Sequence, residues 1–166
     1  LGIHHMKEGF EAFKETIDLA EFAVAGYPGL FLFASIGIFA TVVMQSSHAT
    51  LVLIITALAA GQITYENALA LAIGANIGTT ITAILGSMSA NEQGKRLAGA
   101  HLVFNVVTGV IAIAFIYQLI FVVDGVSRAV GIADDDYTLK LAVFHTIFNL
   151  IGIVVMLPFV NRLVIF

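Results

Sequence analysis

Four long stretches of this chain carry no charged residue. They cover residues 22–65, 67–91, 97–123 and 141–161, and are 44, 25, 27 and 21 residues long. A helix needs about 20 mostly apolar residues to cross the core of a bilayer. The last three stretches therefore predict one membrane-crossing segment each, whereas the first could hold two crossings or a hairpin that enters the membrane and returns.

The middle of the first stretch is polar, and each arm beside it is about 20 residues or fewer, so this part would lie deep in the membrane. Polar or irregular backbone survives there only where it is buried in protein or lines a cavity. We therefore predict a re-entrant helical hairpin over residues 22–65; two full spans joined at the polar part are the alternative. The polar residues are Thr41, Gln45, Ser46, Ser47, His48 and Thr50.

The second stretch contains the run Gly74-Ala75-Asn76-Ile77-Gly78-Thr79-Thr80. Two glycines and an asparagine weaken the interior of a helix, so the run predicts a broken transmembrane helix over residues 67–91. Discontinuous helices in transporters present free N–H groups and free carbonyls to a substrate.

The spans predicted over residues 97–123 and 141–161 share a short motif, H-x-x-F-N. It reads His101 to Asn105 in one and His145 to Asn149 in the other. Residues four apart lie on one face of a helix, so the motif predicts two spans placed alike against the core. The histidines show no metal-ligand spacing, which favours packing hydrogen bonds between helices.

Residues 1–21 combine apolar positions at helical spacing with many charges. This pattern predicts an amphipathic helix at the membrane interface, with a solvated helix packed on other parts of the protein as the alternative. Residues 22–166 then form one transmembrane repeat unit.

Composition supports a lipid environment, since 60% of residues are hydrophobic, only 11% are charged and the mean hydropathy is +1.02. There is no cysteine, which excludes disulfides and thiolate metal sites. No basic stripe indicates nucleic acid as a partner. No nucleophile with a base and an orienting acid lies in the charge-free stretches, so the protein is not expected to be an enzyme.

The two polar parts of the chain offer the ligands that ions need. An anion binds to N–H groups and hydroxyls, and sodium binds to carbonyl, hydroxyl and amide oxygens. Serine and threonine in membrane helices also bond to their own backbone, and small residues also let helices approach. Because two such polar, glycine-containing parts occur in adjacent segments, we favour a transport site.

The sequence Gln45-Ser46-Ser47, followed by Ala49-Thr50 and then by Gly74 to Thr80, resembles the paired motifs of the type II sodium/phosphate cotransporter family, which has bacterial members. The resemblance implies two inverted repeats, each with a hairpin and a broken helix, with sodium and phosphate bound between them. This chain is most similar to the C-terminal repeat. The resemblance implies that Gln45, Ser46 and Ser47 line the site, with Asn76, Thr79 and Thr80 supporting it. We add His48 as a candidate phosphate-binding residue and expect sodium near Thr41, Gln45, Ser46, Ser47, Thr50 and Asn76.

The resemblance thus implies an all-α integral membrane protein that forms one half of an inverted-repeat transporter. The expected function is sodium-coupled symport of inorganic phosphate across a bacterial inner membrane, with sodium as coupling ion and no other cofactor. The alternative is a non-transporting membrane subunit or scaffold whose polar motifs only pack helices. Two departures stand out: His48 replaces a third serine, and only one Gln-Ser-Ser copy is present. A second repeat would come from a missing part of the chain or from another subunit.

Overall fold

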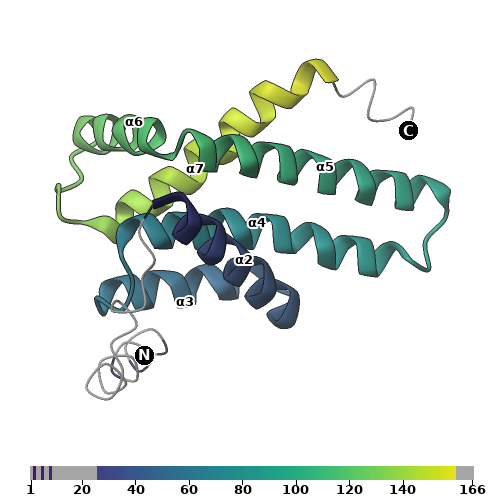
Figure 1. Ribbon diagram of the computed structural model, residues 1–166, viewed down its shortest axis with the longest axis horizontal. Helices are drawn as coiled ribbons and strands as arrows, with labels where there is room; N and C mark the ends of the chain where they lie inside the picture. The colour runs from purple at the N-terminus through teal and green to yellow at the C-terminus, as the bar shows by residue number, and fades with distance from the viewer. Residues whose placement is uncertain (1, 3–4, 6–7, 9–25, 160–166) are drawn as a thin grey trace.

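The protein is helical throughout the part that the structure describes. The computed structural model describes residues 2, 5, 8 and 26–159, and no strand occurs within 26–159 (Figure 1). The helices, in chain order, are α2 (Gly26–Met44), α3 (Ser47–Ala59), α4 (Tyr65–Ser87), α5 (Glu92–Ala114), α6 (Ile116–Ala129), α7 (Tyr137–Met156) and the 3-10 helix η2 (Leu157–Phe159).

Four of these segments are long and apolar enough to cross a membrane, which confirms the prediction of a multi-span, all-α protein. They are Gly26–Met44, Tyr65–Ser87, Glu92–Ala114 and Tyr137–Phe159. The interfacial helix predicted over residues 1–21 lies outside the described residues, apart from positions 2, 5 and 8, and stays a prediction.

Helices α2 and α3 form a helical hairpin over the first charge-free stretch. At 1.5 Å per residue, the 19 residues of α2 span about 28 Å and the 13 residues of α3 about 20 Å. Helix α3 is therefore too short to cross a bilayer core of about 30 Å. Figure 1 shows the hairpin tip beside α4 and short of the far end of α4. The structure thus shows a hairpin whose second arm is shorter than a bilayer core, and its re-entrant placement in the membrane stays a prediction.

The predicted break in the second stretch is wrong, because α4 is one continuous helix through Asn76. Its glycines serve close packing against α2. A Cβ atom on Gly74 would overlap the Ala34 carbonyl oxygen, and one on Gly78 would lie 2.7 Å from the Thr41 Cβ. The missing side chains let the two backbones approach, as small residues do between membrane helices.

Helix α4 is the centre of the molecule. In its most apolar part 61% of the residues are buried, against 28–33% in the other three candidate spans. Leu69 and Ile73 are fully buried there, and Phe144 of α7 belongs to the same apolar core. Polar side chains in the middle of α4, such as Asn76 and Thr80, are therefore held between neighbouring helices.

The span predicted over residues 97–123 is also wrong in its extent. Helix α5 already begins at Glu92, where the Asn91 side chain accepts a hydrogen bond from the Gly94 N–H, and it ends before Phe115. The Tyr27 hydroxyl donates to the Ala114 carbonyl oxygen at 3.1 Å. A side chain that bonds into the helical ladder in this way can interrupt a helix, and α6 begins just beyond it.

The span predicted over residues 141–161 overlaps α7, which begins earlier, at Tyr137, and ends at Met156, while residues 160–161 lie outside the described residues. Helix α7 includes Lys140, a charged residue whose side chain is only 5% exposed. The Lys140 Nζ lies 2.8 Å from an Asp124 carboxylate oxygen and 3.9 Å from one of Asp134. Because this charge is paired, it does not end the helix.

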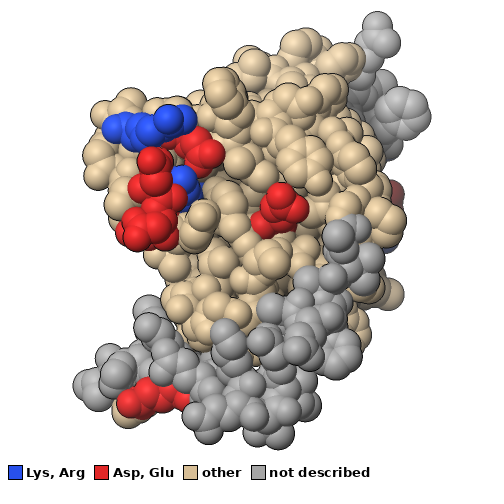
Figure 2. Space-filling model, turned by 60° about the vertical axis from the view of Figure 1, so that its left-hand side comes forward, with Lys and Arg blue, Asp and Glu red and all other residues tan. Residues whose placement is uncertain are grey.

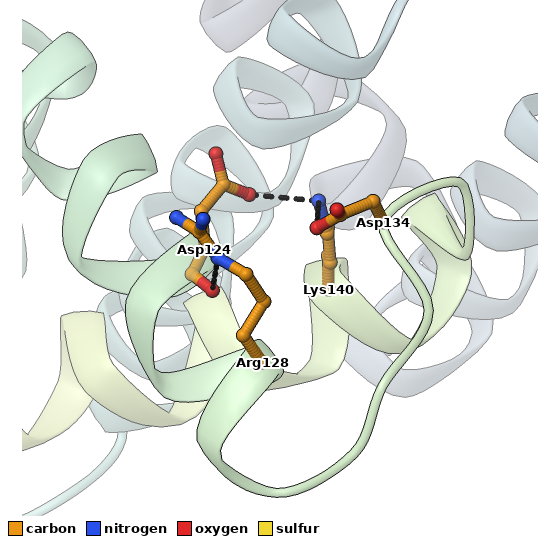
Figure 3. Close-up of polar contacts among 4 residues, drawn as sticks. All are labelled: Asp124, Arg128, Asp134 and Lys140. Carbon is orange, nitrogen blue, oxygen red and sulfur yellow. Dashed lines mark hydrogen bonds and ion pairs between the residues drawn. The ribbon is translucent and has the colours of Figure 1, made fainter.

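These residues belong to a charged patch where α6 ends and α7 begins. Figure 2 shows most charged side chains of that face gathered in this patch, with separate acidic side chains elsewhere on the face. Figure 3 shows Lys140 between Asp124 and Asp134, with Arg128 donating to the backbone carbonyl of Asp124. Hydrogen bonds from the Leu139 N–H and the Thr138 hydroxyl hold the pKa of Asp136 below its ordinary value.

The Asp124→Asn substitution should lower the free energy of unfolding by roughly 2 kcal/mol, because it leaves the buried Lys140 ammonium without its close partner. We expect less than the full cost of breaking a buried pair, since the Asp124 side chain is 32% exposed. Glu92→Gln is the matched control, because the Glu92–Lys95 pair is exposed and contributes at most about 1 kcal/mol. Thermal unfolding in detergent measures both, and equal shifts would contradict the prediction.

Candidate functional site

The hairpin tip brings together two helix ends of opposite polarity. Helix α2 ends at Met44, and Gln45 follows with a φ of +52°, in the left-handed region that side chains seldom adopt. Ser46 caps α3, since its hydroxyl accepts a hydrogen bond from the Ala49 N–H at 3.2 Å. The carbonyls at the end of α2 favour a cation, and the N–H groups at the start of α3 favour an anion.

Two threonines join the arms of the hairpin just behind the tip. The Thr41 hydroxyl donates to the Thr50 hydroxyl at 3.0 Å, and the Thr50 hydroxyl lies 3.1 Å from the Ser46 carbonyl oxygen. Both threonines are buried, whereas Gln45 and His48 are exposed. Thr41 and Thr50, which are candidates for sodium alone, are therefore buried behind the tip, whereas His48, a candidate for phosphate alone, is exposed at it.

Asn76 of α4 is hydrogen-bonded to two residues of α7. Its Nδ2 donates to the Asn149 Oδ1 at 2.9 Å, and its Oδ1 lies 3.3 Å from the His145 Nε2. The Asn149 Nδ2 in turn donates to the His145 carbonyl oxygen at 2.7 Å. The predicted packing role of His145 is confirmed, but its partner is a candidate site residue 69 positions away.

Thr79 and Thr80 use their hydroxyls within their own helix. The Thr79 hydroxyl donates to the Ala75 carbonyl oxygen at 3.0 Å, and that of Thr80 to the Ile77 carbonyl oxygen at 2.6 Å. Thr80 is also fully buried. In this conformation the two threonines stabilise α4 and its packing, and an ion could reach Thr79, which is half-buried, more easily than Thr80.

The hairpin and the Asn76 cluster are neighbours, as the predicted site requires. Thr41 packs against the position of Gly78 on α4. Helix α3, which begins at Ser47, packs against both α4 and α7. The helices that bring the two polar parts together are thus α2, α3, α4 and α7, although a direct bond from Gln45, Ser46 or Ser47 to Asn76 is not among the described contacts.

Comparison with known proteins identifies the kind of protein that carries this site. A model of the Na+/Pi-cotransporter family matches residues 1–133. The chain belongs to this family. It is a family of transporters and not of enzymes, which agrees with the four membrane-crossing candidates.

Curated relatives resemble most of the chain. The protein named "Putative inorganic phosphate export protein YjbB" is 33% identical over 132 residues in Escherichia coli K12, or 80% of this chain, and 31% identical over 131 residues in Salmonella typhimurium, or 78%. "Uncharacterized protein YqeW" of Bacillus subtilis is 29% identical over 126 residues, or 76% of the chain. No solved structure matches.

The chain is short beside these relatives. It spans only 23% of the length of the two YjbB proteins and 39% of YqeW. The family match contains the hairpin, α4, α5 and α6 but ends at residue 133, before α7 begins at Tyr137. The contacts from His145 and Asn149 to Asn76 therefore come from outside the matched region.

Proposed function

We propose that this chain supplies one half-site of a sodium-coupled transporter for inorganic phosphate in the bacterial inner membrane. The observation that carries the proposal is the meeting of opposite helix ends at Gln45 and Ser46. One tip can then receive both ions: sodium at the carbonyl end of α2, and phosphate at the N–H end of α3.

Each ion has a set of side chains in reach of its helix end. The hydroxyl oxygens of Thr41 and Thr50 and the amide oxygens of Gln45 and Asn76 are of the type that sodium prefers. Donors for phosphate come from Gln45, Ser46, Ser47 and His48 at the tip, with Asn76 and Thr79 on the α4 side. Because Thr80 is fully buried, its role is to support α4.

Coupling follows if sodium and phosphate favour the same conformation of the hairpin. Bound sodium would neutralise charge beside the anion and lower the cost of bringing phosphate into a region of low dielectric. A second repeat, from a longer form of this chain or from another subunit, would complete the site. The name of the family favours sodium-driven cotransport, whereas the name of the YjbB relatives refers to phosphate export.

This function is tested by measuring phosphate uptake into proteoliposomes. The protein is purified from its native membrane, in the form in which it is expressed there. We expect uptake to rise at least tenfold when an inward sodium gradient is imposed, since sodium enters with phosphate. Flux of equal size in potassium would contradict sodium coupling.

The Ser47→Ala substitution should lower sodium-driven uptake at least tenfold, because it removes a hydroxyl donor where α3 begins. Ser35→Ala is the matched control, as the Ser35 hydroxyl is exposed on α2 and donates to the Phe31 carbonyl oxygen of its own helix. Normal uptake by Ser47→Ala would remove the site assignment. The scaffold alternative would be favoured if Ser47→Ala lowered thermal stability and the unsubstituted protein showed no detectable phosphate binding.

A further inference from the structure

We propose that His145 and Asn149 are positioning residues of the transport site, which hold the Asn76 amide in one orientation and leave one lone pair of its oxygen available to a cation. The proposal rests on the proposed function and assigns a role to two α7 residues that lie outside the region matched by the family model. It is carried by the hydrogen bonds that connect α7 to α4.

The orientation of all three side chains follows from one backbone carbonyl. The His145 carbonyl oxygen can only accept, so the Asn149 atom 2.7 Å away must be the amide nitrogen. The Asn149 oxygen then faces α4 and must accept from the Asn76 nitrogen at 2.9 Å.

The same reasoning fixes the histidine. With its nitrogen turned to Asn149, Asn76 presents its oxygen to the His145 Nε2 at 3.3 Å. That nitrogen must therefore carry a hydrogen, which selects the tautomer of the ring. No other arrangement of these groups gives each of the three contacts one donor and one acceptor.

The chain of hydrogen bonds has a direct effect on ion binding. An amide oxygen has two lone pairs, and His145 uses one of them, so the second can bind sodium. Without His145 and Asn149, the Asn76 amide could turn and present N–H groups to the same place, which would repel a cation. Substituting a group that orients a metal ligand typically lowers metal affinity about 10- to 100-fold.

The chain carries its own control in the first H-x-x-F-N copy. The Asn105 Nδ2 donates to the His101 carbonyl oxygen at 3.1 Å, as Asn149 does to His145. In the described part of the chain, this first copy makes no hydrogen bond to α4, and His101 is exposed. The two copies thus share the local bond and differ in the contact with Asn76.

The test compares the sodium response of the two copies in the whole protein. We expect His145→Ala and Asn149→Ala to raise the sodium concentration for half-maximal phosphate uptake at least tenfold, with less than a threefold change in maximal rate at saturating sodium. His101→Ala and Asn105→Ala should change both by less than twofold. His145→Gln should restore most of the sodium affinity, because the glutamine amide can donate to the Asn76 oxygen.

A second measurement separates this inference from the proposed function. Sodium-induced thermal stabilisation of the purified protein, with no phosphate present, should be lost in His145→Ala and kept in His145→Gln and His101→Ala. The inference would be overturned, and the proposed function kept, if uptake were sodium-driven but required the same sodium concentration for half-maximal rate in His145→Ala and His101→Ala. Sodium stabilisation without phosphate uptake in the unsubstituted protein would overturn the function instead, and the variants would still decide the inference. If the unsubstituted protein showed no response to sodium at all, both would be wrong.

Discussion

Gly74→Ala should prevent most of the protein from folding into its native helix packing. The new Cβ atom would overlap the Ala34 carbonyl oxygen, which belongs to the backbone and cannot turn away. Helices α2 and α4 would have to separate along their contact, at a cost above the roughly 1–3 kcal/mol of ordinary overpacking. We expect the yield of monodisperse protein in mild detergent to fall at least fivefold.

Gly86→Ala is the control for this substitution within the same helix. No atom lies within 4 Å of a Cβ placed on Gly86, and alanine is a better helix former than glycine. Its yield and unfolding temperature should equal or slightly exceed those of the unsubstituted protein. If the two variants behaved alike, the close approach of α2 and α4 would not be the reason for glycine at position 74.

The Gln45→Gly substitution should abolish transport and leave the protein at least as stable as before. A left-handed conformation costs a residue with a side chain roughly 1–2 kcal/mol, and glycine avoids this cost. If Gln45 binds ions as proposed, the cost of its φ of +52° is offset by the contacts of its side chain. We expect at least a 30-fold loss of sodium-driven phosphate uptake, with an unchanged or higher unfolding temperature.

The Gln45→Asn substitution tests whether transport needs the amide group of Gln45 or only the backbone conformation at this position. Asparagine tolerates the left-handed region and keeps the amide one methylene nearer to the backbone, so partial uptake should remain. A Gln45→Gly protein that transports normally would show that this side chain has no part in ion binding. A clear loss of stability would instead show that the tip conformation is not strained.

The location of the membrane helices could be predicted from the absence of charge, because an unpaired charge is costly in lipid. The same rule misplaced the start of α7, since Lys140 is paired with Asp124 inside the protein. It also could not detect the break at Phe115. That break coincides with a hydrogen bond from Tyr27, which is 87 residues from Ala114.

In the candidate site, too, features set by the local sequence could be predicted, whereas contacts between distant segments could not. Gln45 and Ser46 could be predicted because polar residues in the middle of an apolar stretch are rare, and the structure places them at a helix junction. The glycines of α4 were misread as a break, because a glycine that weakens a helix and one that admits a neighbour look the same in sequence. The contact of His145 with Asn76 could not be predicted, as it depends on how α7 packs against α4.

The positions of the helix starts determine how a copy of this unit would sit in a membrane. Gly26, Tyr65 and Tyr137 line one cavity, and the Tyr65 and Tyr137 rings are 5.1 Å apart, so α2, α4 and α7 all begin at the same end. The chain returns to that end after α3 and again after α6, and then leaves it along α7 (Figure 1). Residues 26 and 159 therefore lie at opposite ends of the helical bundle, on opposite sides of the membrane. A second copy of residues 26–159 that began on the side of the membrane where the first copy ends would therefore have the inverted orientation, with no change to its own fold.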